Sequence, residues 1–345
     1  MQIVHWSPDL QLPTRARAVA LGAFDGVHLG HARTIQAMRH AAHRKRAEAA
    51  VLTFDPSPRE FQDGQRQPGR RLTPVDEQLY YLRRLGIDMV VLFEFPGRIK
   101  QVEPEDFVRD VLVRQLRVVH VTGSSTHRFG SGGGGDLQML QELGGECGFG
   151  VETVPPVMLG GERVSSTRIR NLLSECRVHE AGALLGRPYA VYAPVVPGAG
   201  RGTDLGFPTA NLSIPQEKIL PCDGVYAGLS GKIRGGDREV LEQTRPAAIN
   251  VGLAPTVRGD ERIVEVHLLG EQCDLRGFSI KVEFLRWLRS EEEFENRAEL
   301  AAQIGRDAER AARLATQPIP EELRRFDDFC TSEYVLRPAE QGPET

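Results

Sequence analysis

Two histidines stand three residues apart on a glycine-rich stretch near the start of the chain, in the sequence VALGAFDGVHLGH that ends at His31. Gly22, Gly26 and Gly30 would let the backbone approach a phosphate closely, and a helix that begins after them would point its positive end at the same place. His28 and His31 could then donate hydrogen bonds to oxygens whose negative charge grows in a transition state. Two purely structural histidines are the alternative, whereas zinc is disfavoured because no nearby residues supply its further ligands.

A second segment, RVSSTRIRNLL, combines hydroxyls with arginines at the start of an expected helix. Ser165, Ser166 and Thr167 can cap the N-terminus of that helix. Their remaining hydroxyl and amide groups, together with Arg163 and Arg168, would form an anion site suited to phosphates. A plain helix cap flanked by surface arginines is the alternative.

A third segment, GAGRGTDLGFPTANL, offers a loop and a metal site. Its glycines and arginine predict a loop that closes over phosphates, although no lysine follows and no strand–helix unit surrounds it, so it is neither a Walker A nor a Rossmann string. Thr209 and Asn211 are two residues apart and share one face of an extended segment, where hydroxyl and amide oxygens can hold Mg²⁺. A solvated turn is the alternative. The loop residues are Gly198, Gly200, Arg201 and Gly202.

The first half of the chain alternates short apolar runs with amphipathic segments of helical length. From Ala32 onward, Ile35, Met38 and Ala42 fall on one helical face. The segment EPEDFVRDVLVRQL begins with acids and a proline, as helices do. This alternation predicts an α/β fold, with a parallel sheet, helices on its faces and ligands beyond the carboxyl ends of its strands. The expected strands are residues 18–22, 50–54, 88–95 and 118–122.

Past about residue 188 the apolar runs become short and rich in β-formers, with no helices between them. Consecutive strands of this length predict a small barrel or sandwich. In IKVEF, Lys281 and Glu283 alternate with apolar residues, which predicts a half-buried antiparallel strand. In RIVEVHL, alternation places Glu265 and His267 on the polar face. Charged helical segments are expected at residues 290–315 and 320–330.

The totals describe an ordinary globular protein of about two domains. The chain has 345 residues, of which 40% are hydrophobic and 26% charged, and its formal net charge of -4 gives no sign of a nucleic-acid binder. No apolar run reaches the roughly 18 residues that span a bilayer, and the start lacks a signal-peptide pattern. The five cysteines are scattered without a C-x-x-C pair, so we expect neither disulfides nor a zinc site, and a reducing cytoplasmic location.

The string GAFDGVHLGH resembles the H-x-G-H signature of nucleotidyltransferases, and its full length looks like the adenylyltransferase half of the prokaryotic bifunctional riboflavin kinase/FMN adenylyltransferase (FAD synthetase) family. RVSSTRIRNLL resembles the second signature of that superfamily, and GAGRGTDLGFPTANL resembles the riboflavin kinase module. The segments LPCDGVYAG, AINVGLAPTV, RIVEVHLLG and DLRGFSIKVEFLRWLRSEEEF follow in the family's order. The resemblance implies a Rossmann-like nucleotidyltransferase domain over residues 1–185, a small antiparallel β-barrel kinase domain with a C-terminal helix over 186–330, and a frayed tail over 331–345.

The same resemblance implies two ATP-dependent reactions on small molecules, phosphorylation of riboflavin to FMN in the barrel and adenylylation of FMN to FAD in the N-terminal domain. Glu265 matches the family's catalytic base, and Thr209 and Asn211 would bind Mg²⁺. His28 and His31 would stabilise charge, because an ionised FMN phosphate needs no strong base. The expected ATP and phosphate contacts are Gly22, Phe24, Asp25, Gly26, Arg163, Ser165, Ser166, Thr167, Arg168, Gly198, Gly200, Arg201 and Gly202. The expected flavin contacts are Asp55, Phe207 and Pro208.

Two segments depart from the family pattern. The family usually carries a histidine in F-[DE]-P-H-P, where this chain has Ser57 in FDPSP. The family's G-x-[DN]-F-x-F-G string reads GSSTHRFG, so either Thr126 replaces the Asp or Asn with His127 in the aromatic position, or Ser125 does so after an insertion. Hydroxyls are weaker substitutes for a carboxamide, which predicts weakened adenylyl transfer. A riboflavin kinase with an impaired or inactive N-terminal domain, and a non-catalytic flavin- or nucleotide-binding regulator, are the alternatives.

Overall fold

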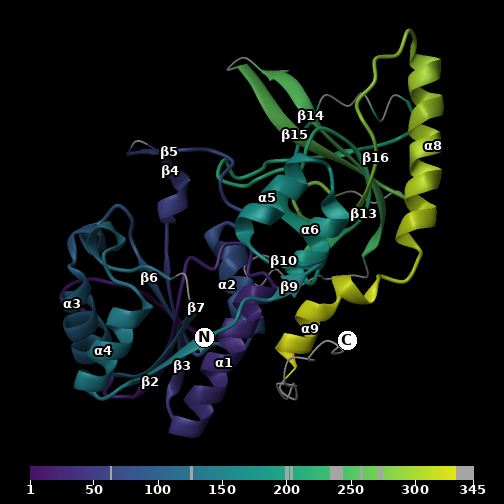
Figure 1. Ribbon diagram of the computed structural model, residues 1–345. Helices are drawn as coiled ribbons and strands as arrows, with labels where there is room; N and C mark the ends of the chain where they lie inside the picture. The colour runs from purple at the N-terminus through teal and green to yellow at the C-terminus, as the bar shows by residue number, and fades with distance from the viewer. Residues whose placement is uncertain are drawn as a thin grey trace.

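Two sheets of different construction divide the chain (Figure 1). The N-terminal half contains a six-stranded parallel sheet, and the C-terminal half contains a closed antiparallel barrel. The computed structural model describes residues 1–62, 64–124, 127–198, 202, 205–233, 244–256, 259–270 and 275–331. The predicted α/β fold followed by an antiparallel barrel is thus confirmed, and the sandwich alternative is wrong.

The N-terminal sheet has the strand order β1-β6-β3-β2-β7-β8, and every neighbouring pair is parallel. Its central strands carry small and β-branched residues that are buried on both faces, as a parallel sheet between helices requires. All four predicted strands are present. The six strands are β1 (Gln2–His5), β2 (Arg17–Leu21), β3 (Glu48–Phe54), β6 (Met89–Phe93), β7 (Val118–Ser124) and β8 (Gly150–Val154).

Helices cover both faces of this sheet. On one face pack α1 (Leu29–Lys45) and α2 (Val75–Arg84), and Ile35 and Met38 of α1 are fully buried there, as their spacing predicts. On the other face pack α4 (Leu137–Cys147) and the segment 104–115. The predicted helix in that segment is present, but only α3 (Pro104–Asp106) is α-helical, and η3 (Phe107–Gln115) has the wider π-helical turn.

The barrel strands run in the order β11-β12-β15-β14-β13-β16. Alternate side chains such as Val264, Val266 and Val282 fill its interior. The helices α5 (Ser166–Ser174) and α6 (Val178–Leu185) add apolar side chains to the same cluster, so they link the two halves. The strands are β11 (Tyr189–Val196), β12 (Ala210–Leu212), β13 (Gly224–Ile233), β14 (Arg245–Thr256), β15 (Gly259–Leu268) and β16 (Ser279–Arg289).

Two C-terminal helices pack on different halves of the molecule (Figure 1). The long helix α8 (Arg297–Ala315) lies along β13 and β14, and its Ala311 is buried in one cluster with Ala227. The short helix α9 (Arg325–Cys330) packs beside α1 through the fully buried Phe326. The C-terminal end of the described chain therefore returns to the N-terminal half.

Several short elements complete the described residues. Among all the helices of the described residues, none is both long and apolar enough to span a bilayer. The short elements are η1 (Pro58–Glu60), β4 (Phe61–Gln62), β5 (Gln65–Arg66), η2 (Arg98–Gln101), η4 (Ser131–Gly133), β9 (Met158–Leu159), β10 (Glu162–Arg163) and η5 (Glu321–Leu323).

The cysteines depart from expectation. Cys176 follows α5, Cys222 precedes β13, and the two form a disulfide with Cα atoms 5.3 Å apart, although 46 positions separate them in the sequence. The prediction of no disulfide is therefore wrong, because spacing along the chain does not report which loops the fold brings together. Cys147 and Cys330 are free. The expected frayed tail over 331–345 lies outside the described residues beyond residue 331.

The strand β16 is antiparallel to both neighbours, as predicted, but its polar face is covered. Glu283 is only 9% exposed and its carboxylate lies 2.6 Å from Lys281 Nζ. On the neighbouring strand β11, Tyr192 meets Tyr81 of α2 with their hydroxyls 3.1 Å apart. The outer surface of the barrel here packs against the N-terminal domain, a long-range contact that strand alternation does not reveal.

Candidate active sites

The histidine stretch forms the turn between β2 and α1, at the carboxyl edge of the parallel sheet. His28 is the N-cap of α1, and its Nδ1 accepts a hydrogen bond from the backbone N–H of His31 at 3.3 Å. The two imidazoles stack with ring centres 3.6 Å apart, and the Phe24 ring lies edge-on to His31. A side chain at Gly30 would press on the His28 ring. The turn therefore presents both histidines side by side.

The hydrogen bonding of His28 assigns its proton. Because Nδ1 is an acceptor, the neutral ring carries its hydrogen on Nε2, which remains a donor. Burial, with smaller contributions from the positive charges of Arg187 and Arg163, lowers the pKa of His28 to about 3. Burial and then His28 hold the pKa of His31 well below its ordinary value. Both rings are neutral near pH 7, so they can stabilise negative charge as hydrogen-bond donors and not as cations.

Asp25, which the sequence assigns to phosphate contacts, has several partners inside the protein. It is 2% exposed, and its carboxylate accepts hydrogen bonds from the backbone N–H groups of Leu72 and Thr73 at 2.9 and 3.0 Å. The guanidinium of Arg170 binds the same carboxylate. Nearby, Val27 has a φ of +39°, a conformation that costs energy for a β-branched residue. Asp25 therefore acts on the shape of the turn.

The segment around α5 reaches the same place, and its predicted residues divide into two groups. Ser165 caps α5 as predicted, accepting from the Arg168 backbone N–H at 3.2 Å. Ser166 Oγ donates to the backbone carbonyl of Asp25 at 2.8 Å and so ties α5 to the histidine turn. The Arg168 guanidinium turns away to the β9–β10 hairpin, where it lies 3.0 Å from the carboxylate of Glu162.

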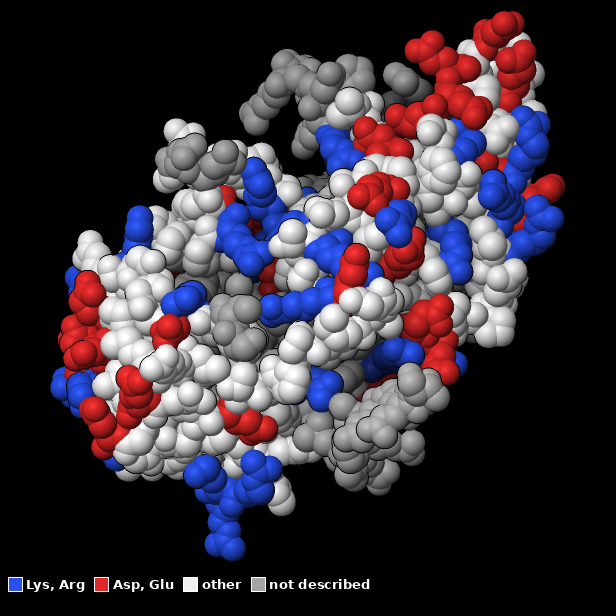
Figure 2. Space-filling model, viewed as in Figure 1, with Lys and Arg blue, Asp and Glu red and all other residues white. Residues whose placement is uncertain are grey.

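A cavity of about 240 Å³ opens beside the histidines. Arg59, Arg128 and Arg163 line it, and Figure 2 shows Lys and Arg side chains gathered around a hollow near the β4–β5 hairpin and α5. Positive charge of this kind suits a polyphosphate. Sequence reasoning missed Arg59, which donates to Thr167 Oγ1 at 3.2 Å, because it lies in neither motif. Of the predicted contacts, the cavity wall includes Gly22, Phe24, Asp25, His28, His31, Arg163, Ser165, Ser166 and Thr167.

The two departures from the family pattern lie near this cavity. His127 lines it, and burial lowers the pKa of its ring to about 4, so the imidazole is neutral. Ser125 and Thr126 lie outside the described residues. Ser57 is buried at the start of η1, where its backbone N–H donates to Glu60 Oε1 at 2.7 Å.

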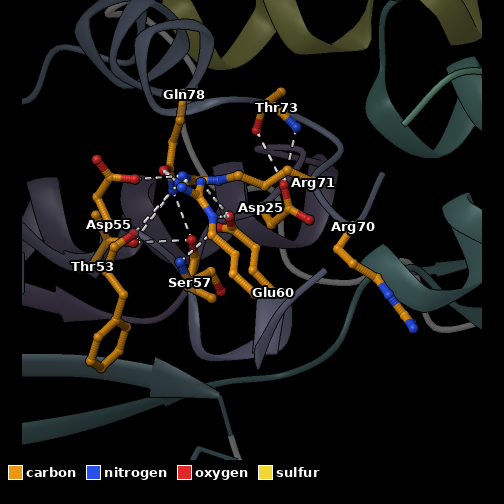
Figure 3. A network of polar contacts seen from close by, with 12 residues as sticks. Asp25, Thr53, Asp55, Ser57, Glu60, Arg70, Arg71, Thr73 and Gln78 are labelled. Carbon is orange, nitrogen blue, oxygen red and sulfur yellow. Dashed lines mark hydrogen bonds and ion pairs between the residues drawn. The ribbon is translucent and has the colours of Figure 1, made fainter. Parts of the chain in front are cut away.

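A buried arginine organises the loop that carries Ser57 (Figure 3). Arg71 is 1% exposed and its guanidinium binds Asp55 at 2.7 Å, Gln78 at 3.0 Å and Glu60 at 3.4 Å. The amide of Gln78 also donates to the backbone carbonyl of Ala23 at 2.7 Å. The Asp55 carboxylate is thereby fixed, with 30% of its side chain exposed. Arg71 and Gln78 connect it by hydrogen bonds to the Ala23 carbonyl, at the start of the histidine turn.

Aromatic rings stand beside Asp55. Phe95 meets Phe54 with ring centres 6.3 Å apart and Phe61 with centres 5.5 Å apart. All three rings are partly exposed. The rings are set edge-on to one another and form an apolar surface next to a fixed carboxylate. Sequence reasoning missed this surface because the three residues belong to separate segments.

In the barrel, the register of three strands gathers the predicted kinase residues. Glu265 of β15 pairs with Asn211 of β12 on one side and with Asn250 of β14 on the other. Asn250 Nδ2 donates to Glu291 Oε1 at 3.2 Å. The sequence does not single out Asn250 or Glu291, although in AINVG the amide stands alone among apolar residues.

The glycine loop closes on these same side chains. A side chain at Gly198 would collide with the Asn211 amide, and one at Gly202 would collide with the Phe207 carbonyl and crowd the Thr209 side chain. Gly200 and Arg201 lie outside the described residues. The predicted loop and the Thr209–Asn211 segment are therefore in contact.

The predicted flavin contacts lie in two places. Phe207 packs edge-on against His267 with ring centres 5.5 Å apart, and His267 Nδ1 lies 2.9 Å from the Pro208 carbonyl oxygen. These residues adjoin Glu265 in the barrel, whereas Asp55 belongs to the N-terminal domain. Within the described part of the chain, no three His, Cys, Asp or Glu side chains gather to hold a metal ion. This finding does not test the expected Mg²⁺ ligands, because Thr209 and Asn211 are of none of those four types.

Comparisons with known proteins cover both halves. The FAD synthetase family model matches residues 11–168, and the riboflavin kinase family model matches residues 185–315. Proteins described as bifunctional riboflavin kinase/FMN adenylyltransferase are similar along most of their length. The Escherichia coli K12 protein is 36% identical over 86% of this chain and 92% of its own, and the Haemophilus influenzae protein is 32% identical over 90% and 98%.

A solved structure has the same arrangement. It comes from Streptococcus pneumoniae, is described as a macrolide-efflux protein, and matches with a TM-score of 0.80 and 27% identity over 91% of this chain and 99% of its own. Together with the parallel sheet, the barrel and the two sites, these matches show that the chain belongs to the bifunctional riboflavin kinase/FMN adenylyltransferase family.

Proposed function

We propose that this chain makes FAD from riboflavin in two steps, each on its own domain, with the division at residues 1–185 and 186–330. The observation that carries the proposal is the presence of two separate sites suited to phosphates, one at the histidine turn and one at the glycine loop of the barrel. The matches to both family models favour two activities over a kinase with an inactive N-terminal domain and over a non-catalytic regulator.

In the barrel, the riboflavin 5′-hydroxyl attacks the γ-phosphorus of ATP, and the bond to the ADP oxygen breaks. Glu265 accepts the hydroxyl proton, since its carboxylate lies beside Asn211 and Asn250 at the site. Phe207 and Pro208 line the flavin side, and the loop at Gly198 and Gly202 covers the phosphates.

The kinase reaction also needs Mg²⁺, and the donor set fits it. The Thr209 hydroxyl and the Asn211 amide oxygen are hard oxygen ligands of the kind that this ion prefers. Bound there, the ion would offset the negative charge of the phosphates. Asn211 would be kept in position by Gly198, against which its amide packs.

In the N-terminal domain, a phosphate oxygen of FMN attacks the α-phosphorus of ATP and pyrophosphate leaves. The attacking phosphate is already ionised, so the site has no proton to remove. His28 donates through Nε2–H, His31 lies stacked beside it, and Arg59 and Arg163 draw the leaving phosphates toward the wall of the cavity. The flavin ring lies on the aromatic surface beside Asp55.

Two variants separate the reactions. His31→Ala is expected to lower FAD formation from supplied FMN by roughly tenfold or more, about 1.4 kcal/mol of transition-state stabilisation, and to leave riboflavin phosphorylation intact. Glu265→Gln is expected to do the reverse. Chromatography of the flavins formed from riboflavin or FMN with ATP and Mg²⁺ measures both. Wild-type protein that formed no phosphorylated flavin would contradict the proposal as a whole. The cytoplasmic location of the protein stays a prediction.

A further inference from the structure

Arg187 stands at the junction of the domains, between α6 and β11, and binds the backbone of the histidine turn. Its Nη2 donates to the carbonyl of Gly26 at 2.7 Å and its Nη1 to the carbonyl of Val27 at 3.0 Å. These are the two residues that precede His28, and both have positive φ values, +87° and +39°. A side chain outside the adenylyltransferase segment therefore binds the most constrained part of that site.

Two aromatic rings pack against this guanidinium. It lies 3.7 Å from the centre of the Tyr81 ring on α2 and 4.6 Å from the centre of the Phe326 ring on α9. Phe326 is fully buried, and its backbone N–H donates to the carbonyl of Gly186 at 2.9 Å. Arg187 is 9% exposed, so its donors have little access to water and their direction is set by the rings.

Such a contact bears on the geometry of the histidine turn. Two parallel N–H donors on adjacent carbonyls fix the path of the backbone into the N-cap of α1, and hence the aim of His28 Nε2. A displacement of about 1 Å at a reacting centre can lower a rate by roughly 100-fold. Asp25 holds the turn through its side chain, whereas Arg187 binds these two carbonyls directly.

We propose that Arg187 is a positioning residue for adenylyl transfer, supplied from the start of the barrel domain and locked in place by helix α9. The kinase domain and the C-terminal helix thus complete the adenylyltransferase site without touching its substrates. The inference rests on the proposed role of the histidine turn.

The test compares Arg187→Met with Arg187→Lys in the full-length protein. Arg187→Met removes both donors and is expected to lower kcat for FAD formation from FMN by roughly tenfold or more, with KM for FMN and ATP changed by less than about twofold. Arg187→Lys keeps the charge and one donor direction, so it should recover part of the rate. The riboflavin kinase rate in the same sample reports the fraction of folded protein and should stay at the wild-type value.

Arg84→Met is the matched control. Arg84 packs against the same Phe326 ring at 5.8 Å and pairs with Asp327 of α9 at 2.7 Å, yet it makes no described hydrogen bond to the turn. Its kcat should stay within about twofold of wild type. An Arg187→Met enzyme with wild-type kcat, an equal loss in Arg84→Met, or a parallel loss of kinase activity would each overturn the inference. A fully active His31→Ala enzyme would instead overturn the role of the histidines, whatever Arg187→Met does.

Discussion

The buried ion pair between Lys218 and Glu77 tests how the two domains are joined. Lys218 Nζ lies 2.5 Å from the carboxylate of Glu77 on α2, and their side chains are 0% and 2% exposed. The same ammonium donates to the backbone carbonyls of Leu72 at 2.9 Å and Ala190 at 2.7 Å. We predict that Lys218→Met is strongly destabilising, because it leaves a carboxylate buried without this cation.

The expected size follows from these contacts. Removing one partner of a buried ion pair costs about 3–5 kcal/mol of the free energy of unfolding. The two carbonyls lose a donor worth about 1 kcal/mol each, so the upper part of that range is expected. Glu77→Gln should cost less, since Lys218 keeps an oxygen acceptor at each of its three positions. In the double variant, the cost should fall short of the sum of the single costs by about 2 kcal/mol.

Urea unfolding of the wild type, the two single variants and the double variant measures this coupling. The control is Arg114→Met, which breaks a pair with Asp110 whose side chains are 76% and 46% exposed. An exposed pair of this kind contributes about 0.5 kcal/mol or less. The reasoning would be refuted if Lys218→Met destabilised the protein no more than Arg114→Met, or if the single costs were additive to within about 0.5 kcal/mol.

Three further outcomes are expected. Cys222→Ser opens the disulfide across 46 positions and should lower the free energy of unfolding by about 4 kcal/mol. Dithiothreitol should have the same effect on the wild type, whereas Cys330→Ser should leave the stability unchanged. Equal urea midpoints for Cys222→Ser and the wild type would contradict this. Gly198→Ala pushes the Asn211 amide aside and should lower riboflavin phosphorylation by roughly tenfold or more, and an unaffected kinase rate would remove this amide from the site. The pKa of His28 is 6.5 when unfolded and about 3 when folded, so the unfolded chain binds more protons between these values; stability should be complete above pH 6.5 and fall by up to about 1.4 kcal/mol per pH unit below it. His28→Gln should flatten that slope, and an unchanged slope would contradict the assignment.

Local patterns were enough to predict the elements and the two motifs. The histidine turn follows a buried strand and opens a helix, so its place at the sheet edge depends only on neighbouring residues. Likewise, alternation along β15 puts Glu265 on the polar face, and β-pairing then aligns it with Asn211. The turn and the strand alternation therefore depend on neighbouring residues, whereas the pairing of β15 with β12 joins distant segments.

Contacts between distant segments could not be predicted in this way. Cys176 and Cys222 meet because the end of α5 lies beside the segment before β13, where the Cys222 backbone N–H donates to the Leu173 carbonyl at 2.9 Å. Glu283 is covered where α2 packs over β11, the strand beside β16. Asp25 sits in a motif and looks like a phosphate contact, but its bonds to Arg170 and to the segment at Leu72 are visible only in the fold. The residues that shape a site are therefore harder to find in a sequence than the residues that react in it.

The charges at the domain junction have a common design, in which cations from the barrel side bind backbone carbonyls of the N-terminal domain. Arg187 binds Gly26 and Val27, and Lys218 binds Leu72. Burying such charges stabilises a protein less than apolar side chains of the same volume would. Apolar contacts, however, have no direction, whereas an N–H donor fixes the oxygen that it binds. Gly26 and Val27 belong to the histidine turn, and the backbone N–H of Leu72 binds Asp25. We therefore infer that these two cations are retained for the orientation that they impose on the adenylyltransferase site. Replacing both by apolar side chains should then lower the rate of adenylyl transfer by a larger factor than it lowers the rate of riboflavin phosphorylation.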